Sequence, residues 1–439
     1  MRVGSLQMTN RYLKQLNRTY EDQTKLMEQS DGAKIHRPSD DQVGYSKYLR
    51  YNVSYGENNQ YQNNVKTAIS WMRNCDSALV DITNCFKTVV EKTNQAQGTN
   101  TDSDMRAIAE EMLVMVQQSV SDANMEINGR YLFSGQRDLI QPYNISYETK
   151  AERGLTKTLD DKQSLFFNDV SKSTDLSQML VMKGNDGNKY FLNTKTGNVY
   201  TEDFVEEGYK EKISAGQETV DIKDAVGSIN FGNVSEHFDK YGVIKDEAGN
   251  GKNYSPTITV NGILVSLKFD TVEQYIVTYQ GDNKNFSMVK ENGNVQPASD
   301  SVNVSGVDIA GKSIFDNDDS GNEPSGANAF NDMLTVVAMC DRGEKEGSRW
   351  MNSDGKTLAN NSYNTILNSQ TKLAARQQVY GDCQDMLVTQ NETILGDITD
   401  VHSTDVAKLA VELMTAQTIY QLSLSVGSRI LPPTLADYL

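Results

Sequence analysis

Residues 406–430 read VAKLAVELMTAQTIYQLSLSVGSRI, and this stretch predicts a long helix that packs against a partner helix. Its apolar and small residues recur at alternating steps of three and four, the 3.5-residue period of a coiled-coil seam. Here a seam is the line of side chains that faces the partner helix, and its predicted members are Val406, Leu409, Leu413, Ala416, Tyr420, Ser423, Gly427 and Ile430. Ser and Gly weaken this seam, so the helix needs partners to be stable.

The N-terminal segment carries a matching pattern. Its predicted seam residues are Leu6, Thr9, Leu13, Leu16, Tyr20, Gln23 and Met27. Residues 1–50 hold nine basic and six acidic groups, a net charge of +3, whereas residues 381–439 hold two basic and eight acidic, a net charge of −6. Because opposite charges favour association, we expect the two ends of the chain to pair. The predicted assembly interface consists of Leu6, Leu13, Leu16, Tyr20, Val406, Leu409, Leu413, Tyr420 and Ile430.

Proline and glycine divide the chain into three parts. There is no proline between Pro38 and Pro142, nor between Pro324 and Pro432, and long helices require such stretches. Eighteen of the 31 glycines fall in residues 144–328. We therefore predict helical segments over 1–143, an inserted β-rich domain over 144–328, and helical segments over 329–439 that pair with the N-terminal part.

The middle part has the signals of antiparallel strands. Residues 257–269 alternate in hydrophobicity around Asn261-Gly262, a strong hairpin signal. Two further hairpins are expected, one joining 179–182 to 189–192 and one joining 274–279 to 285–289. The predicted fold class is α+β: a long coiled-coil rod built from both termini, with one inserted, mostly antiparallel β domain.

Composition excludes several classes of function. The net charge of −17 argues against binding to nucleic acid or to an anionic membrane surface, because both need clustered Lys and Arg. No stretch approaches the roughly 18 uncharged apolar residues of a membrane span. The first thirty residues lack a continuous apolar run, so no cleaved secretory signal is expected.

Catalytic and metal-binding patterns are also missing from the sequence. The four cysteines do not form C-x-x-C spacing, and the three histidines do not form H-E-x-x-H. Residues 316–321 match the start of a calcium loop, but Ala327 stands where the bidentate Glu belongs, so a solvated acidic loop is the preferred interpretation. We expect no catalytic residue, no metal, no cofactor and no enzymatic activity.

Three stretches resemble the flagellin-like family. Residues 30–41 (SDGAKIHRPSDD) are similar to the segment after the first helix of flagellin-like proteins, with Pro38, Ser39, Asp40 and Asp41 as its core. Residues 128–135 (NGRYLFSG) and the end of the chain resemble the hook-associated protein 3 type within that family. The matching residues there are Asn128, Gly129, Tyr131, Phe133, Gly135, Asp437, Tyr438 and Leu439. Gln42 and Pro432-Pro433 depart from the family pattern.

This resemblance implies a structural adaptor at the hook–filament junction of the bacterial flagellum. It implies export through the flagellar type III apparatus without a cleaved signal, and an extracellular location. The implied partners are the preceding hook-associated junction protein, flagellin, an export chaperone and neighbouring copies in a ring, with no nucleic acid and no membrane. Flagellin itself, a secreted enzyme on a flagellin-like frame and a non-flagellar coiled-coil surface protein stay open as alternatives.

Overall fold

The computed structural model describes residues 2–98, 100–146, 150–168, 176–232, 234–245, 251–284, 286, 301–316 and 324–430. The chain forms two compact units, Met1–Thr67 with Gly381–Leu439, and Ala68–Tyr380. Two long helices, α2 (Gln42–Ala96) and α9 (Lys356–His402), contribute residues to both units. The predicted borders at residues 143 and 328 lie inside the second unit, so the three-part division stays a prediction.

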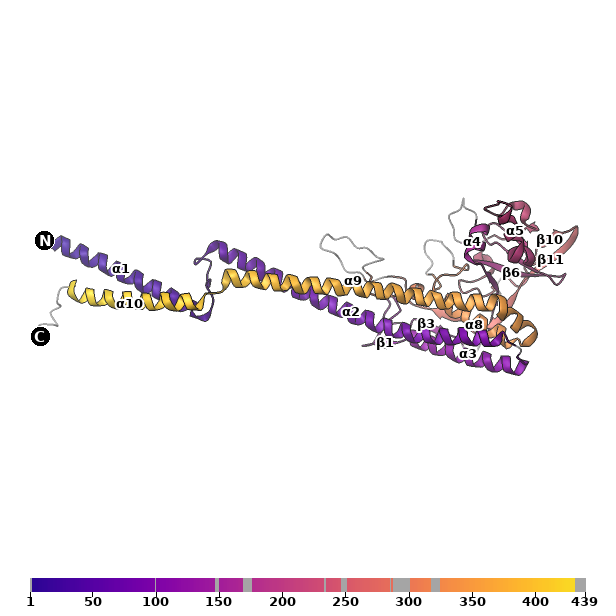
Figure 1. The fold of residues 1–439 in the computed structure, drawn as a ribbon, viewed down its shortest axis with the longest axis horizontal. Coiled ribbons are helices and arrows are strands. Elements are labelled where there is room, and N and C mark those ends of the chain that lie inside the picture. Colours follow the sequence, from indigo (N-terminus) through magenta and orange to yellow (C-terminus); the bar gives the residue numbers. More distant parts are fainter. Residues whose placement is uncertain are drawn as a thin grey trace. The chain divides into compact units, whose positions relative to one another are not determined.

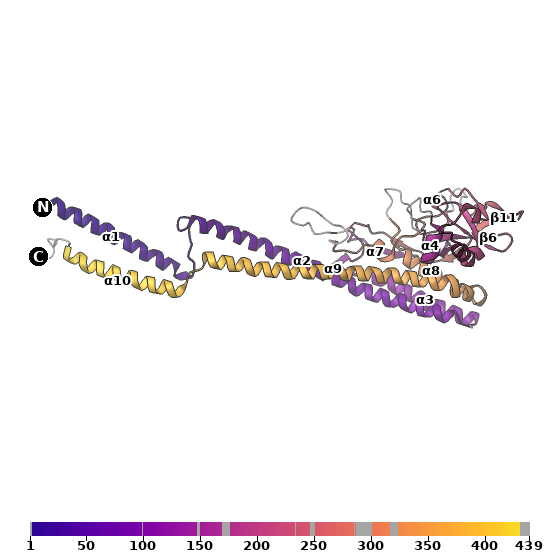
Figure 2. The same cartoon turned by 45° about the horizontal axis from the view of Figure 1, so that its top comes forward.

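The first unit consists of paired helices. Helix α1 (Arg2–Glu28) lies beside α10 (Val406–Ile430), and Figures 1 and 2 both show them running antiparallel, with the two chain ends at the same end of the pair. The N-terminal part of α2 pairs with the C-terminal part of α9 in the same unit. Short linkers connect α1 to α2 and α9 to α10.

The second unit contains a helix bundle with a dense core. The bundle consists of residues 68–96 of α2, α3 (Asp102–Ala123), α8 (Asn328–Asp341) and residues 356–380 of α9. Helix α3 begins with a capping box in which the Thr101 and Asp104 side chains each accept a bond from the other residue's backbone N–H. The Phe86 and Phe330 rings meet edge to face, 5.5 Å apart, and neither is exposed.

The same unit carries a β module built on one curved sheet. Its strand order is β10-β11-β6-β7-β8-β9, with β5 paired to β6, and every ladder among the described strands is antiparallel. An apolar cluster that includes Phe231, Phe238 and Phe315 packs with side chains of this sheet. The bounds are β5 Thr156–Thr158, β6 Gln178–Gly184, β7 Lys189–Leu192, β8 Asn198–Thr201, β9 Gly227–Ser228, β10 Thr257–Val260 and β11 Ile263–Phe269. Short helices α4 (Asp161–Phe167), α5 (Tyr209–Ser214) and α6 (Val234–His237) accompany the sheet.

Two small ladders, called the stem below, connect the β module to the bundle. One pairs β3 (Tyr143–Ile145) with β13 (Val277–Tyr279), and the other pairs β4 (Ala151–Gly154) with β12 (Thr271–Gln274). The chain therefore leaves the bundle and returns to it along the same stem. A separate hairpin of β1 (Glu126–Ile127) and β2 (Arg130–Tyr131) follows α3, and α7 (Gly306–Ala310) precedes α8.

The predicted α+β class is confirmed, with helices from both flanks and an antiparallel β insertion. The hairpin around Asn261-Gly262 is β10–β11, where both turn residues have positive φ, and the predicted 179–192 hairpin is β6–β7. The strand predicted over 285–289 lies outside the described residues apart from residue 286.

Candidate assembly surfaces

The α1–α10 pair is held by a sparse seam. Tyr12 donates its hydroxyl proton to the Ser423 carbonyl oxygen at 2.8 Å, and the Tyr20 and Tyr420 rings lie 6.0 Å apart. The Tyr12 ring occupies the space beside Gly427, where a side chain would overlap it. Leu409 is fully buried in this pair, whereas no described side chain of α1 is. The two helices therefore bury little apolar surface against each other.

The α1 side of this seam differs in register from the prediction. The half-buried positions are Thr9, Tyr12, Leu16, Thr19, Gln23 and Leu26. Leu13 and Tyr20 were predicted to face α10, but they are 43% and 58% exposed and lie at the edge of the seam. The reason is local: the Tyr12 ring fits the notch at Gly427 and its hydroxyl finds a carbonyl partner, which places position 12 rather than 13 inward.

The α10 side follows the predicted register through most of its length. Leu409 and Gly427 are buried, and Leu413, Ala416, Tyr420 and Ser423 are half-buried on the same face. Val406 is 69% exposed because it starts the helix beyond the end of the contact. Leu6 and Ile430 belong to the two helices, but their side chains lie outside the described residues. The role of these residues in assembly stays a prediction.

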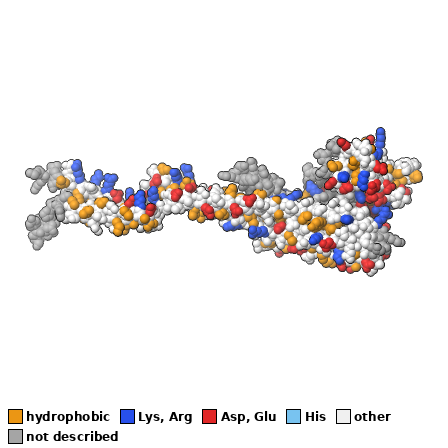
Figure 3. Space-filling model, viewed as in Figure 1, with side chains coloured by type: hydrophobic (Ala, Val, Ile, Leu, Met, Phe, Trp, Pro, Cys, Tyr) orange, Lys and Arg blue, Asp and Glu red, His pale blue; other side chains and the backbone are white. Residues whose placement is uncertain are grey.

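Helix α10 carries a second apolar face outside its seam, which extends from the flank of the seam to the opposite side of the helix. This face, called the outer face below, consists of Val411, Met414, Ile419, Leu422 and Val426. Met414 and Leu422 are 70% and 60% exposed, and the sequence of α10 holds only three charged residues. Figure 3 shows apolar side chains along α10 and Lys and Arg side chains along α1. Large exposed apolar patches mark interaction sites, so the outer face is the principal candidate surface in this chain.

The linkers between the helix pairs form an elbow held by backbone bonds. Lys34 N–H donates to the His402 carbonyl oxygen at 2.6 Å, and Thr404 N–H donates to the Gly32 carbonyl oxygen at 3.0 Å. These bonds tie the 31–41 linker to the 403–405 linker. Gly32 has a φ of +94°, a left-handed conformation that favours glycine.

The residues Pro38 to Asp41 shape this elbow. Asp40 N–H donates to the Arg37 carbonyl oxygen at 3.0 Å, which closes a turn with Pro38 and Ser39 at its centre. The Asp41 carboxylate caps α2 by accepting from the N–H groups of residues 43 and 44, at 3.1 and 3.0 Å. The Arg37 N–H bond to Asp40 holds the pKa of that carboxyl below its ordinary value.

The 128–135 motif builds the connection between α3 and the stem. Asn128 and Gly129 have φ of 53° and 74° and form the tight turn between β1 and β2. Phe133 is fully buried, and its carbonyl oxygen accepts a bond from the Tyr279 hydroxyl at 2.9 Å. Gly135 has a positive φ and packs on the Asp282 backbone, where a side chain would overlap it. Tyr131 is half-buried in β2. Asp437, Tyr438 and Leu439 lie outside the described residues.

A buried polar layer joins α2 to α9 in the first unit, and sequence periodicity did not reveal it. Asn58 donates to the Gln390 side chain at 3.2 Å, and Gln62 donates to Asn58 at 2.8 Å and to the Leu387 carbonyl oxygen at 3.2 Å. Asn58 is 3% exposed. A polar residue inside a coiled coil specifies the register at a cost in stability. The signal was present as Asn and Gln at heptad spacing, but only their buried positions identify their role.

The described residues hold no group of three His, Cys, Asp or Glu side chains placed to bind a metal ion. All four cysteines are free thiols, and burial raises the pKa of Cys340 to about 12. Asp316, from the calcium-like stretch, accepts bonds from Ser313 N–H and Ser325 N–H, while residues 317–323 lie outside the described part of the chain. None of the helices that the structure describes is long and apolar enough to cross a membrane.

Comparison with known proteins finds a family match in the N-terminal helical part of the chain. Residues 3–138 match the model of the bacterial flagellin N-terminal helical region. The chain is 27% identical over 171 residues to flagellar hook-associated protein 3 of Salmonella typhimurium. The match covers 38% of the chain and 54% of that relative, so the chain spans about half the length of the curated relative it matches.

Solved structures of similar description also match. A putative flagellar hook-associated protein from Vibrio parahaemolyticus is 12% identical, with 83% of this chain and 100% of that chain covered and a TM-score of 0.42. Hook-associated protein-3 from Legionella pneumophila is 12% identical, with coverages of 80% and 99% and a TM-score of 0.38. The resemblance predicted from the motifs is confirmed by the sequence comparisons: residues 3–138 match the model of the bacterial flagellin N-terminal helical region, and the chain is similar to flagellar hook-associated protein 3.

Proposed function

We propose that this protein is a structural subunit of the bacterial flagellum, an adaptor at the hook–filament junction that supports flagellin assembly. The observation that carries the proposal is the pair of apolar faces on α10: one packs on α1, and the other has no cover within the described chain. A helix that is apolar on two sides suits a position between its own partner helix and a neighbouring subunit.

The energetics of the terminal pair fit such an assembly. Full burial of a Val, Leu, Ile or Met side chain contributes about 1.5–3 kcal/mol, so covering the five residues of the outer face adds several kcal/mol for each subunit. The α1–α10 seam buries far less, with Leu409 as its one fully buried described residue of large size. Neighbouring copies in a ring would therefore provide most of the stability of the terminal helices.

The partners and the location follow from the similarity to hook-associated protein 3. In this proposal the chain contacts the preceding hook-associated protein on one axial side and flagellin on the other, with neighbouring copies beside it. It binds an export chaperone, leaves the cell through the flagellar type III apparatus, and stays outside the cell at the junction. It carries out no reaction.

Deletion of the gene with electron microscopy tests the location. The expected result is hooks without filaments, with flagellin lost into the medium. Immunogold labelling of the complemented strain should mark one band beside the hook. Labelling along the whole filament would instead identify the chain as flagellin, and normal filaments in the deletion strain would reject the flagellar proposal.

A charge placed on the outer face tests the surface. Ile419→Asp with Leu422→Asp should leave the circular dichroism of the purified protein and its export unchanged, because both side chains are exposed. The strain should lack filaments. Ala410→Asp with Gln417→Asp is the control, since it adds the same charge to the same helix at exposed positions between the seam and the outer face. Normal filaments in the Ile419 and Leu422 strain would contradict the assignment of this face.

A further inference from the structure

The stem of the β module rests against a polar stripe on α8. Asn328, Asn331, Asp332 and Thr335 are spaced by three, one and three residues, so they share one face of the helix. The last three are no more than 4% exposed. A buried polar face on a helix is unusual, because each polar group there needs a partner to offset its desolvation.

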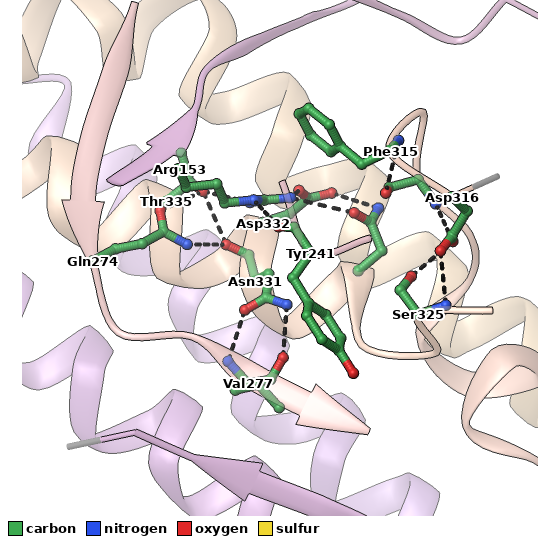
Figure 4. Close-up of polar contacts among 12 residues, drawn as sticks. Arg153, Tyr241, Gln274, Val277, Phe315, Asp316, Ser325, Asn331, Asp332 and Thr335 are labelled. Carbon is green, nitrogen blue, oxygen red and sulfur yellow. Dashed lines mark hydrogen bonds and ion pairs between the residues drawn. The ribbon is translucent and has the colours of Figure 1, made fainter. Parts of the chain in front are cut away.

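The stem supplies those partners through its backbone and side chains. The Asn331 side chain accepts from Val277 N–H and donates to the Val277 carbonyl oxygen, both at 2.9 Å, so it pairs with β13 as a neighbouring strand would. Gln274 of β12 donates to the Asn331 carbonyl oxygen at 3.1 Å and accepts from the Thr335 hydroxyl at 2.8 Å. Figure 4 shows Gln274, Val277 and Arg153 converging on this face of α8.

Arg153 of β4 contributes the positive charge to this contact, opposite Asp332 of α8. Its guanidinium donates to Asp332 at 2.8 Å, to Thr335 at 2.6 Å and to the Tyr241 carbonyl oxygen at 3.1 Å. Arg153 and Asp332 side chains are 4% and 5% exposed. The guanidinium thus joins three segments that are distant in sequence: the stem, α8 and the 239–244 turn of the β module.

We infer that Arg153 and the α8 polar stripe form a latch that fixes the stem, and with it the β module, in one orientation on the helix bundle. A buried ion pair contributes little net stability compared with apolar residues of the same volume, but its directed hydrogen bonds are satisfied in only one arrangement. The apolar cluster of the β module contains none of the latch residues. The latch therefore contributes to the mounting of the module rather than to its folding, beside the Lys157–Asp354 ion pair that joins β5 to the segment before α9.

Hydrogen exchange on a latch-free protein tests this inference. Arg153→Met with Asp332→Leu removes both charges and leaves no unpaired ion in the interface. The expected result is at least tenfold faster amide exchange in the stem peptide 271–279, where Val277 N–H bonds to Asn331, the neighbour of the substituted Asp332. Exchange in peptides covering 178–201 and 105–123 should stay at the wild-type rate, and the thermal midpoint should change by only a few degrees.

A matched control removes another ion pair of the β module. Lys212 and Asp224 lie 2.6 Å apart and do not contact the stem, so Lys212→Met with Asp224→Leu should leave stem exchange unchanged. Unchanged stem exchange in the Arg153 and Asp332 variant would overturn the inference. So would equal acceleration in the stem, the module and the bundle, because that pattern would make the ion pair an ordinary part of one cooperative core.

Discussion

The terminal helix pair and the helix bundle of the second unit are both helical, but they differ in how much they bury. Eleven of the 14 residues of α8 are buried, including Phe330 and Met333, whereas the described part of α1 has no buried side chain. Hydrophobic stabilisation follows the apolar area removed from water, so the bundle gains more stability from contacts within the chain than the terminal pair does. The difference teaches that one sequence can combine a densely packed bundle with terminal helices that bury little apolar surface.

The largest expected effect tests the bundle. Phe330→Ala removes a fully buried ring that packs on Phe86 and on Tyr143, 5.5 and 5.0 Å away. It should lower the free energy of unfolding by about 3–5 kcal/mol, measured by urea denaturation. Val114→Ala on α3, where the side chain is 54% exposed, is the control and should change stability by less than about 0.5 kcal/mol. A small effect at Phe330 would remove the contrast between the two regions.

The next prediction concerns the terminal seam. Leu413→Asp places a charge on the α10 face that meets α1. The urea midpoint of the second unit should stay unchanged, because that unit does not contain Leu413. The protein should still be exported, but the cells should lack attached filaments in electron micrographs and should be non-motile. A shifted midpoint would show that the two units unfold together, and normal filaments would exclude a role for this seam in assembly.

A smaller effect is expected at the polar layer between α2 and α9. Asn58→Leu with Gln390→Leu replaces a hydrogen-bonded pair by apolar side chains, which in a coiled coil raises stability and weakens the choice of register. The helix content should melt at a higher temperature, while disulfide trapping of engineered cysteine pairs should detect more than one register. A lower melting temperature would show that this layer contributes stability as well as register.

Acid should affect the elbow and the latch with opposite signs. The hydrogen bond to His36 holds the pKa of Asp31 below its ordinary value, and the bond from Arg37 N–H lowers the pKa of Asp40. Both carboxylates therefore stabilise the elbow above about pH 4, and this stabilisation is lost as the pH falls through their folded-state pKa values. Burial raises the pKa of Asp332, so its ionised form costs stability, and that cost appears as pH rises through the raised pKa. Nuclear magnetic resonance titration of the three carboxyls should show shifts in these directions. Asp31 titrating at or above pH 4 would contradict the elbow geometry.

The smallest effect is expected at Gly427, where the Tyr12 ring packs against the backbone of α10. Gly427→Ala should displace the Tyr12 ring and weaken its bond to Ser423. The alanine also favours the helix by about 1 kcal/mol, so the two effects partly cancel. The measured change in α10 helicity should be slight, and Tyr12→Phe, which removes only the hydroxyl, is the matched comparison. A large loss of helicity would show that the notch determines the pairing.

Sequence reasoning was most successful where the signal is local. Asn261-Gly262 predicts its hairpin because both residues tolerate positive φ, and the α10 seam follows from spacing alone. It failed where the answer depends on a partner far along the chain. Whether position 12 or 13 of α1 faces inward depends on the absence of a side chain at Gly427, and Arg153 and Asp332 meet across 179 residues. The 128–135 motif was recognised by resemblance, while its physical basis, the contact of Gly135 with Asp282, required the fold.

The stem has a consequence for how proteins of this architecture can vary in length. Residues 145 and 277 are direct cross-strand partners, so the polypeptide that begins and ends the insertion is already adjacent at that point. A two-residue turn could close the gap without altering the terminal helices, which lie in the other unit. The intervening region thus behaves as a cassette, free to be lost, enlarged or exchanged during evolution, while selection on the bundle and the terminal helices continues independently.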